Sequence, residues 1–335
     1  MHSVLLAVHE KHFNNVILDE DVKRLEAAVK VVRRTDLDRA PEEKLIAALQ
    51  DAGADILMTC WGAPSVTLKV MKACPKLKYL VHLAGELKWF VERAAIENGL
   101  LVTNWGDSTS ASTAEGALAM TFALLRNYHK MTDVMRVKRL YWETPGVVDE
   151  GLFEQRVGLH GLGAIAQEYV KLIKPFDCKV SAFSPHVPDS IFRNLGVKRA
   201  GSLEELYGSN RIISCHAART PATHHIVDAR ILALIEDGGY FINTGRGSVV
   251  DTQALIAELR KGRISAALDV YEEEPLPADS PLRDLPNCLV IPHRAGPTPD
   301  YRRVMGRHGV DNVLRYVKGE KVDSVVDLKK YDLMT

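Results

Sequence analysis

The sequence of 335 residues predicts an α/β protein with two successive parallel-sheet regions. In residues 1–105, short apolar runs alternate with segments of helical period, and the same alternation begins again at Val157 and continues to His293. Parallel strands need crossover connections, usually helices, so this rhythm predicts two sheets covered by helices. The length is also sufficient for two domains.

Each element of the first region follows from its apolar pattern. The expected strands are Val4 to Val8, Ile56 to Thr59, Tyr79 to Leu83 and Leu101 to Val102. The segment Trp105 to Ser112 has the Gly, Ser, Thr and Asp content of a linker, and it leads into an expected helix from Thr113 to Lys130. We place the first domain boundary at this linker. After His293, Pro299 to Lys318 reads as one more long helix.

Composition excludes several classes of partner. Lys plus Arg equals Asp plus Glu at 43 each, so no overall field attracts nucleic acid or an anionic membrane. The longest apolar run, Gly116 to Leu125, is too short to span a bilayer, and the N-terminus does not resemble a signal peptide. The five cysteines are scattered and form no CxxC pair, which predicts no disulfide framework and no metal site. We expect a cytoplasmic protein with reduced thiols.

Three chemically active residues each follow a stretch that reads as a buried strand. Arg246 follows Tyr240 to Asn243, Glu274 follows Ile264 to Val270, and His293 follows Cys288 to Pro292. Open parallel sheets bind ligands outside the carboxyl ends of their strands, so the three side chains should meet in one crevice. An imidazole oriented by a carboxylate can carry a proton, and a guanidinium can grip a carboxylate.

The second region opens with a glycine turn between a strand and a helix. Gly161, Gly163 and Ala166 form the pattern GxGxxA. The first glycine permits the tight turn, the second lets a pyrophosphate approach the backbone, and Ala166 allows close helix packing. Such turns also occur for purely structural reasons. Here, the strand and helix context favours a dinucleotide site at the helix N-terminus.

The position that would meet the ribose is Ser184, which follows the expected strand Lys179 to Phe183 and lies 23 residues beyond Gly161. NAD sites usually carry Asp or Glu there. Serine does not repel a 2′-phosphate, and His186 could assist one, but no Arg or Lys stands immediately beside Ser184. Asp189 is close enough to replace the acid. The cofactor is therefore NAD or NADP, with a slight preference for NAD.

Four blocks of sequence together resemble the D-isomer-specific 2-hydroxyacid dehydrogenase family over nearly the full length. They are Gly161 to Ala166, Asn243 to Asp251, Ala266 to Pro275 and Pro292 to Gly296, with 28 residues from Arg246 to Glu274 and 19 from there to His293. The resemblance implies a Rossmann NAD-binding domain, residues 108–297, inserted into a discontinuous flavodoxin-like substrate domain, residues 1–107 and 298–335.

The resemblance also implies catalytic roles. Arg246 would bind the substrate carboxylate and carbonyl oxygen, and His293 would be the general acid in reduction and the base in oxidation. Glu274 would hydrogen-bond His293 and raise its pKa. The neighbouring Glu272 and Glu273 are rivals for this role, but we interpret them as solvated charges. We expect three further histidines to be packed side chains and not catalysts, namely His160, His224 and His225.

Other family positions carry over by their motifs. The expected cofactor contacts are Ala164 and Ile165 at the pyrophosphate, Ser184 at the ribose, Ala217, Ala218 and Thr223 along the adenine and ribose wall, Thr244 and Gly245 beside the nicotinamide, and Asp269 at the carboxamide. For Asp269, capping of a turn is the alternative.

The expected substrate contacts lie in the first region. The family loop that presents backbone amides to the substrate carboxylate matches Ala84 and Gly85, and Gly85 suits close approach. Trp61 either lines the cleft or packs within the protein. Glu86 is unusual beside an anion site, and it either points to solvent or meets a hydroxyl or cationic group of the substrate.

The sequence thus predicts an NAD(P)-dependent dehydrogenase that interconverts a small 2-oxo acid and its D-2-hydroxy acid, as a reductase of substrates like glyoxylate or hydroxypyruvate. A homodimer is implied, joined through the helix at Thr113 to Lys130 and the segment with Tyr141 and Trp142, unless those aromatics pack within one subunit. Two alternatives are a dehydrogenase of another small anion, such as formate or phosphite, and a dinucleotide-sensing binding protein.

Overall fold

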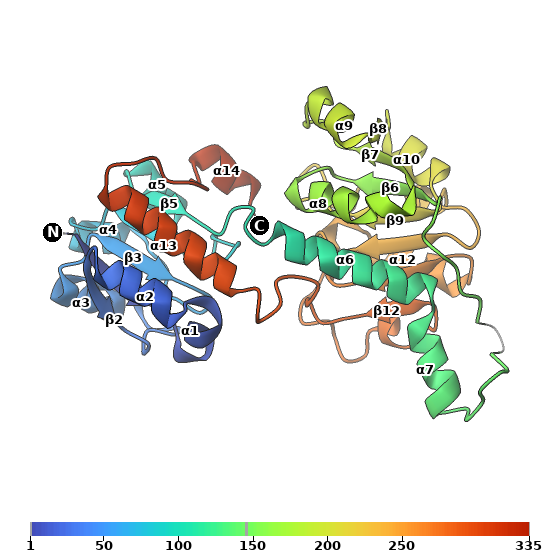
Figure 1. Cartoon of the computed structure of the whole chain (residues 1–335), viewed down its shortest axis with the longest axis horizontal. Helices are drawn as coiled ribbons and strands as arrows, with labels where there is room; N and C mark the ends of the chain where they lie inside the picture. Colours follow the sequence, from blue (N-terminus) through green and yellow to red (C-terminus); the bar gives the residue numbers. More distant parts are fainter. Residues whose placement is uncertain (1, 145–146, 335) are drawn as a thin grey trace. The chain divides into compact units, whose positions relative to one another are not determined.

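The computed structural model describes residues 2–144 and 147–334. The chain divides into two compact units, Met1–Thr109 with Pro297–Thr335, and Ser110–Gly296. Each unit is built on one parallel sheet with helices on it, as Figure 1 shows. The predicted α/β class with two parallel-sheet regions is therefore confirmed.

The first unit holds a five-stranded sheet in the order β2-β1-β3-β4-β5, which is the flavodoxin-like order. The strands are β1 (Ser3–Ala7), β2 (Lys30–Arg33), β3 (Ile56–Thr59), β4 (Tyr79–His82) and β5 (Leu101–Thr103). Four of them match the expected strands to within one residue at each end. The edge strand β2 was missed, because its residues are only half-buried or exposed and so carry no apolar run.

Helices cover both faces of this sheet. They are α1 (Glu10–Val16), α2 (Asp19–Glu26), α3 (Glu42–Ala52), α4 (Leu68–Ala73), α5 (Arg93–Glu97), α13 (Arg303–Val317) and α14 (Leu328–Leu333). The late helix α13 packs beside α2 and over β4, as the red and blue helices of Figure 1 show. Two glycines of α13 permit close packing on other segments, since a Cβ at Gly306 would stand 1.8 Å from the oxygen of Val16, the last residue of α1, and one at Gly309 2.2 Å from the Leu83 side chain.

The second unit holds a seven-stranded sheet in the order β12-β11-β10-β9-β6-β7-β8, with every pair parallel. The strands are β6 (Arg156–His160), β7 (Lys179–Phe183), β8 (Lys198–Arg199), β9 (Ile212–Cys215), β10 (Tyr240–Asn243), β11 (Ser265–Leu268) and β12 (Cys288–Val290). The strand order reverses between β6 and β9, as in a Rossmann fold, and ligands bind at such a switch point.

The helices of the second unit are α6 (Ser110–Leu125), α7 (Tyr128–Arg136), α8 (Ala164–Ile173), α9 (Asp189–Leu195), α10 (Leu203–Ser209), α11 (Ala229–Leu232) and α12 (Thr252–Arg260). Short 3₁₀ turns are η1 (Lys174–Phe176), η2 (Gly247–Val249) and η3 (Pro281–Arg283). Helices α6 and α8 pack side by side on one face of the sheet (Figure 1).

The single helix expected from Thr113 to Lys130 was wrong. It is two helices, because Asn127 adopts a left-handed backbone with φ of 49° and so separates α6 from α7. The Asn127 side chain donates a hydrogen bond to the carbonyl oxygen of Val148 at 2.5 Å, which stabilises the chain at this left-handed residue. Apolar periodicity continues through such a break and cannot reveal it.

Within residues 2–144 and 147–334, no helix combines the length and apolar character needed to cross a membrane. All five cysteines are free thiols.

Candidate active site

The carboxyl ends of three neighbouring strands lie at one edge of the second sheet. Asn243 pairs with Leu268, and Leu268 pairs with Val290, so β10, β11 and β12 end side by side. The turns that follow these strands carry Arg246, Glu274 and His293. The strand ends therefore bring the three predicted catalytic residues to the same edge of one unit.

His293 and Glu274 are in direct contact. The imidazole Nδ1 lies 2.8 Å from the Glu274 Oε2. The other carboxylate oxygen, Oε1, accepts a hydrogen bond from the Tyr271 amide at 3.0 Å. The Glu274 carboxylate is thus held from both sides, and its bond to Nδ1 leaves Nε2 of His293 as the nitrogen that can exchange a proton with a substrate.

Each member of this pair shifts the pKa of the other. The hydrogen bond and charge of Glu274 raise the pKa of His293 above its ordinary value, although burial and the Arg246 charge oppose this. For Glu274, burial opposes ionisation, but the hydrogen bonds from His293 and Tyr271 and the Arg246 charge bring its pKa below the ordinary value. Arg246 therefore lies close enough to act on both groups, and the pair favours a carboxylate with an imidazolium.

Arg246 is held at the start of η2. Its guanidinium donates to the Gly245 carbonyl oxygen at 2.8 Å. The next residue, Gly247, packs so closely on the segment before Glu274 that a Cβ would stand 1.8 Å from the Tyr271 carbonyl carbon and 2.3 Å from the Glu272 nitrogen. Sequence reasoning missed this role of Gly247, although the second glycine of the Gly-Arg-Gly run was its signal.

Asp269 supports the loop that carries His293. It is buried, and its Oδ1 accepts hydrogen bonds from the amides of Arg294 at 2.5 Å and Ala295 at 2.9 Å. Burial raises its pKa. Both contacts use Oδ1, so Asp269 caps this turn through one carboxylate oxygen. The same loop lies on α6, where a Cβ at Gly116 would stand 1.8 Å from the Ala295 oxygen.

In the glycine turn after β6, Gly163 has open space beside it, whereas Gly161 faces backbone, as does Gly245 after β10. Gly161 has φ of 93°, and its Cβ would stand 3.1 Å from the His216 oxygen, while a Cβ at Gly245 would stand 2.8 Å from the Ala217 oxygen. At Gly163, in contrast, a Cβ would meet nothing within 4 Å.

Gly163 is also the N-cap of α8, and no side chain caps this ten-residue helix. Ala164 and Ile165 form its first turn, and Ala166 is fully buried against the sheet. An uncapped helix N-terminus beside open space offers backbone amides and a positive dipole end to an anion. These residues fit the pyrophosphate of a dinucleotide.

The surroundings of Ser184 contain an arginine that the sequence did not reveal. Arg199, from β8, donates to the Ser184 carbonyl oxygen at 3.0 Å and to the Val187 carbonyl oxygen at 2.5 Å. Its Nε also donates to Asp189 at 2.7 Å. The arginine thus holds the ribose-position loop and partly neutralises Asp189. No cation precedes or follows Ser184 directly in the sequence, and only strand pairing between β7 and β8 brings Arg199 there.

The wall expected beside the cofactor follows β9. Ala217 is buried, and the Thr223 hydroxyl donates to the Ala218 carbonyl oxygen at 2.7 Å. Sequence reasoning missed His216, which lies within 3.4 Å of the Thr244 hydroxyl. Burial lowers the pKa of His216 to about 4, so it is neutral near pH 7. Its place directly after a strand at the switch point was the available signal.

In the first unit, hydrogen bonds to its carbonyl oxygens hold the expected substrate loop in place. Asn104 donates to the Gly85 oxygen at 2.8 Å, and the Trp105 amide lies 3.4 Å from the Ala84 oxygen. A Cβ at Gly85 would stand 2.4 Å from the Trp105 ring, so packing against this indole alone requires a glycine. Glu86 is exposed in its unit, as in the solvent-facing alternative.

Trp61 is half-buried within the first unit. Its ring meets Trp105 edge-on with centroids 6.1 Å apart, and the Arg302 guanidinium lies over it at 5.1 Å from the centroid. These contacts pack the Trp61 ring against its own unit. His160, in the second unit, is buried within 3.2 Å of the Tyr207 hydroxyl, as expected for a packed side chain. His224 and His225 lie outside the trio.

Comparison with known proteins agrees with this architecture. The sequence model described as D-isomer specific 2-hydroxyacid dehydrogenase, NAD binding domain, matches residues 118–295. A D-3-phosphoglycerate dehydrogenase of Methanocaldococcus jannaschii is 31% identical over 93% of this chain, which spans 58% of that protein's length. A glyoxylate reductase of Thermofilum pendens is 27% identical over 94% of each chain.

A solved structure of a 2-hydroxyacid dehydrogenase from Ketogulonicigenium vulgare has a TM-score of 0.79 at 28% identity, covering 97% of this chain and 99% of that one. The family match covers more than half of the residues and includes the glycine turn, Arg246, Glu274 and His293. The chain belongs to the D-isomer specific 2-hydroxyacid dehydrogenase family.

Proposed function

We propose that this protein is an NAD(P)-dependent dehydrogenase that reduces a small 2-oxo acid to its D-2-hydroxy acid and catalyses the reverse oxidation. The observation that carries the proposal is the Glu274–His293 pair with Arg246 at the carboxyl edge of the second sheet. A proton carrier with a raised pKa and a guanidinium are the two groups that reduction of an anionic ketone requires.

The roles follow from the contacts. The nicotinamide dinucleotide, when bound, supplies or accepts the hydride at the substrate carbon. Arg246 binds the substrate carboxylate and polarises its carbonyl oxygen. In reduction, Nε2–H of His293 donates a proton to that oxygen. In oxidation, neutral His293 removes the hydroxyl proton. Glu274 keeps Nδ1 protonated and the ring oriented throughout.

In the first unit, Ala84 and Gly85 are assigned to the carboxylate end of the substrate. Among the described residues, no hydrogen bond from the backbone amide of Ala84 or Gly85 is found, so both amides are available to an anion. Their carbonyl oxygens are already held by Trp105 and Asn104, which fixes the direction of the peptide groups.

The residues assigned to the dinucleotide are those selected from the sequence. Gly161, Gly163, Ala164 and Ile165 take the pyrophosphate, Ser184 the ribose, Ala217, Ala218 and Thr223 the adenine side, and Thr244, Gly245 and Asp269 the nicotinamide side. NAD is slightly preferred over NADP, because Arg199 already donates to three acceptors and Asp189 offsets its charge.

The substrate assigned is a small 2-oxo acid of the glyoxylate or hydroxypyruvate type. The glyoxylate reductase relative, which is 27% identical, matches along 94% of its own length. We place the enzyme in a reducing cytoplasm, in keeping with its five free thiols, and as a homodimer.

The experiment is to follow NADH and NADPH absorbance with a panel of 2-oxo acids that includes glyoxylate, hydroxypyruvate, pyruvate and 3-phosphohydroxypyruvate. We expect turnover of at least one short 2-oxo acid to the D-product, faster with NADH than with NADPH. Absence of turnover across the panel would rule out the proposed activity, and a higher efficiency with NADPH would overturn the cofactor assignment.

A further inference from the structure

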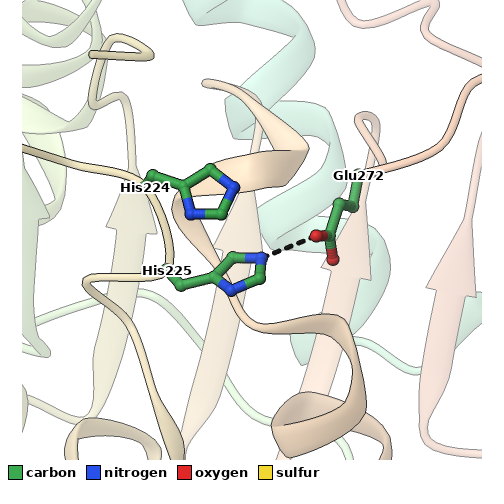
Figure 2. Close-up of side chains that lie close together, drawn as sticks. All are labelled: His224, His225 and Glu272. Carbon is green, nitrogen blue, oxygen red and sulfur yellow. Dashed lines mark hydrogen bonds and ion pairs between the residues drawn. The ribbon is translucent and has the colours of Figure 1, made fainter. Parts of the chain in front are cut away.

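Three side chains with metal-binding atoms gather in the second unit, outside the Arg246, Glu274 and His293 trio. They are His224, His225 and Glu272, and their ligand atoms all lie within 4.8 Å of one another. Figure 2 shows the two imidazoles on one loop and Glu272 facing them from a separate segment. The sequence had led us to interpret all three as side chains without a chemical role.

The two histidines are held together by an unusual backbone. His225 has φ of 52°, in the left-handed region that residues other than glycine seldom adopt. In this conformation the rings of His224 and His225 lie stacked, with centroids 4.0 Å apart and an interplanar angle of 28°. Strained residues of this kind concentrate at functional sites.

The loop is also fixed to its neighbours. The His225 amide donates to the Ser248 carbonyl oxygen at 2.9 Å, and the Val227 amide donates to the Val249 carbonyl oxygen at 3.1 Å. Both acceptors belong to η2, the turn that follows Arg246. The imidazoles are therefore presented by a backbone that is anchored on the catalytic turn.

Glu272 reaches the histidines from the loop after β11. Its Oε1 lies 2.6 Å from His225 Nε2. Its backbone is fixed as well, because Glu272 lies directly against Gly247.

We propose that His224, His225 and Glu272 bind a divalent transition-metal ion of the zinc class. Two imidazoles and one carboxylate are ligands that zinc accepts, whereas calcium and magnesium prefer all-oxygen sites. Bonds of about 2.0–2.1 Å place tetrahedral ligand atoms roughly 3.3 Å apart. Ligand atoms that lie up to 4.8 Å apart therefore have to close by at most about 1.5 Å, whereas His225 Nε2 and Glu272 Oε1, at 2.6 Å, have to move apart. Their exposure permits this adjustment, and water completes the coordination.

A hydrogen bond between His225 and Glu272 alone does not account for the arrangement, because His224 takes no part in it. A shared ion uses all three side chains. It would also join the loop of the cofactor wall to the segment that leads to Glu274, two residues beyond Glu272. Binding should therefore stabilise the second unit, since an ion that binds only the folded state raises its stability by mass action.

The test titrates untagged, full-length, metal-free protein with Zn²⁺ in the absence of substrate and dinucleotide, by calorimetry. We expect one ion per chain and a higher Tm in the presence of Zn²⁺. The variants His224→Ala and Glu272→Gln should bind Zn²⁺ at least about tenfold more weakly and lose the Tm increase. Two matched controls, His186→Ala and Glu273→Gln, change an exposed imidazole and a neighbouring carboxylate and should behave as the wild type.

Co²⁺ provides a spectroscopic check on the ligands. A visible spectrum of four-coordinate Co²⁺ without thiolate bands is expected in the wild type and should be lost in both site variants. Equal Zn²⁺ affinity in the wild type and the two site variants, or binding that depends equally on the control positions, would overturn the proposal. None of these readouts depends on turnover, so they stand apart from the test of the dehydrogenase activity.

Discussion

The contact between His293 Nδ1 and Glu274 determines both the orientation and the protonation of the imidazole. The carboxylate can only accept a hydrogen bond, so Nδ1 stays protonated and Nε2 performs the transfer. Reduction needs the imidazolium, and the raised pKa of His293 keeps that form populated to higher pH. The rate of reduction should therefore fall as pH rises through this pKa, and the rate of oxidation should rise.

The substitution Glu274→Gln tests this coupling. Glutamine can still accept the hydrogen bond from Nδ1 but carries no charge, so the pKa of His293 should fall. In pH profiles of kcat/KM, the alkaline decline of the reduction should move to lower pH, and the Glu273→Gln control should leave it in place. An unchanged alkaline limb in Glu274→Gln would show that Glu274 does not set the pKa of His293.

The substitution Gly163→Ala tests dinucleotide binding with little effect on the stability of the fold. A Cβ at this position meets nothing within 4 Å in the protein, and alanine is only a poorer N-cap than glycine, so the free energy of unfolding should fall by no more than about 1 kcal/mol. The added methyl group would occupy the space assigned to the pyrophosphate, and the Kd for NADH should rise by at least about tenfold. Fluorescence titration measures the affinity, and wild-type affinity in Gly163→Ala would contradict the assignment of the turn.

The sequence identified those site residues that belong to a pattern of neighbouring positions along the chain. Arg246, Glu274 and His293 each follow a recognisable apolar run, and parallel pairing then brings them to one edge of the sheet. Arg199 had no such signal, since only the pairing of β8 with β7 brings it to the site. The signal for His216 was its place directly after a strand at the switch point. The stacking of His224 on His225 was equally invisible, because it depends on the left-handed backbone of one residue.

Among the elements, the turn η2 connects the cofactor wall, the catalytic arginine and the segment before Glu274. Gly247 allows this turn to lie on the backbone of Tyr271 and Glu272. Gly247→Ala should therefore destabilise the protein by about 1–3 kcal/mol through overpacking and should also reduce kcat/KM by displacing Arg246.

Urea unfolding together with kinetics measures both effects of Gly247→Ala. The matched control is Gly151→Ala, where a Cβ meets nothing within 4 Å, and it should change neither quantity. If Gly247→Ala were as stable and active as Gly151→Ala, the close packing of η2 would not position Arg246.

Elements with strong apolar runs were predicted well. The strands β3, β7 and β10 have the predicted bounds, and β1, β4, β5, β11 and β12 deviate by at most two residues at either end. No bounds were predicted for β6 and β9. The exposed edge strand β2 and the two-residue β8 lacked an apolar run to identify them. The break between α6 and α7 depends on one left-handed asparagine, and the pattern of apolar residues does not encode it.

For the whole molecule, the exposed aromatic surface after α7 bears on assembly. Trp142 is 89% exposed and Tyr141 68%, and the two rings touch mainly each other, with centroids 4.9 Å apart. They do not pack into the core of their own unit, so the alternative of packing within one subunit loses support. Large exposed apolar side chains of this kind commonly mark an interface.

Analytical sedimentation, which reports the oligomeric state, tests the proposed homodimer. Wild-type protein should sediment as a dimer, and Trp142→Ser should shift it toward the monomer. Trp89→Ser is the matched control, since Trp89 is 75% exposed in the first unit, and it should leave the dimer intact. A monomeric wild type, or a dimer unaffected by Trp142→Ser, would contradict the assigned interface.

The proposed activity of the whole molecule depends on proton transfer by His293. The most direct measurement compares single-turnover reduction of a 2-oxo acid by NADH in the wild type and in His293→Ala. General acid catalysis is commonly worth about 10²–10⁴ in rate, so the hydride-transfer rate should fall by a factor in that range while the Kd for NADH stays unchanged. The exposed His186→Ala serves as the control and should react at the wild-type rate. A wild-type rate in His293→Ala would contradict the central claim.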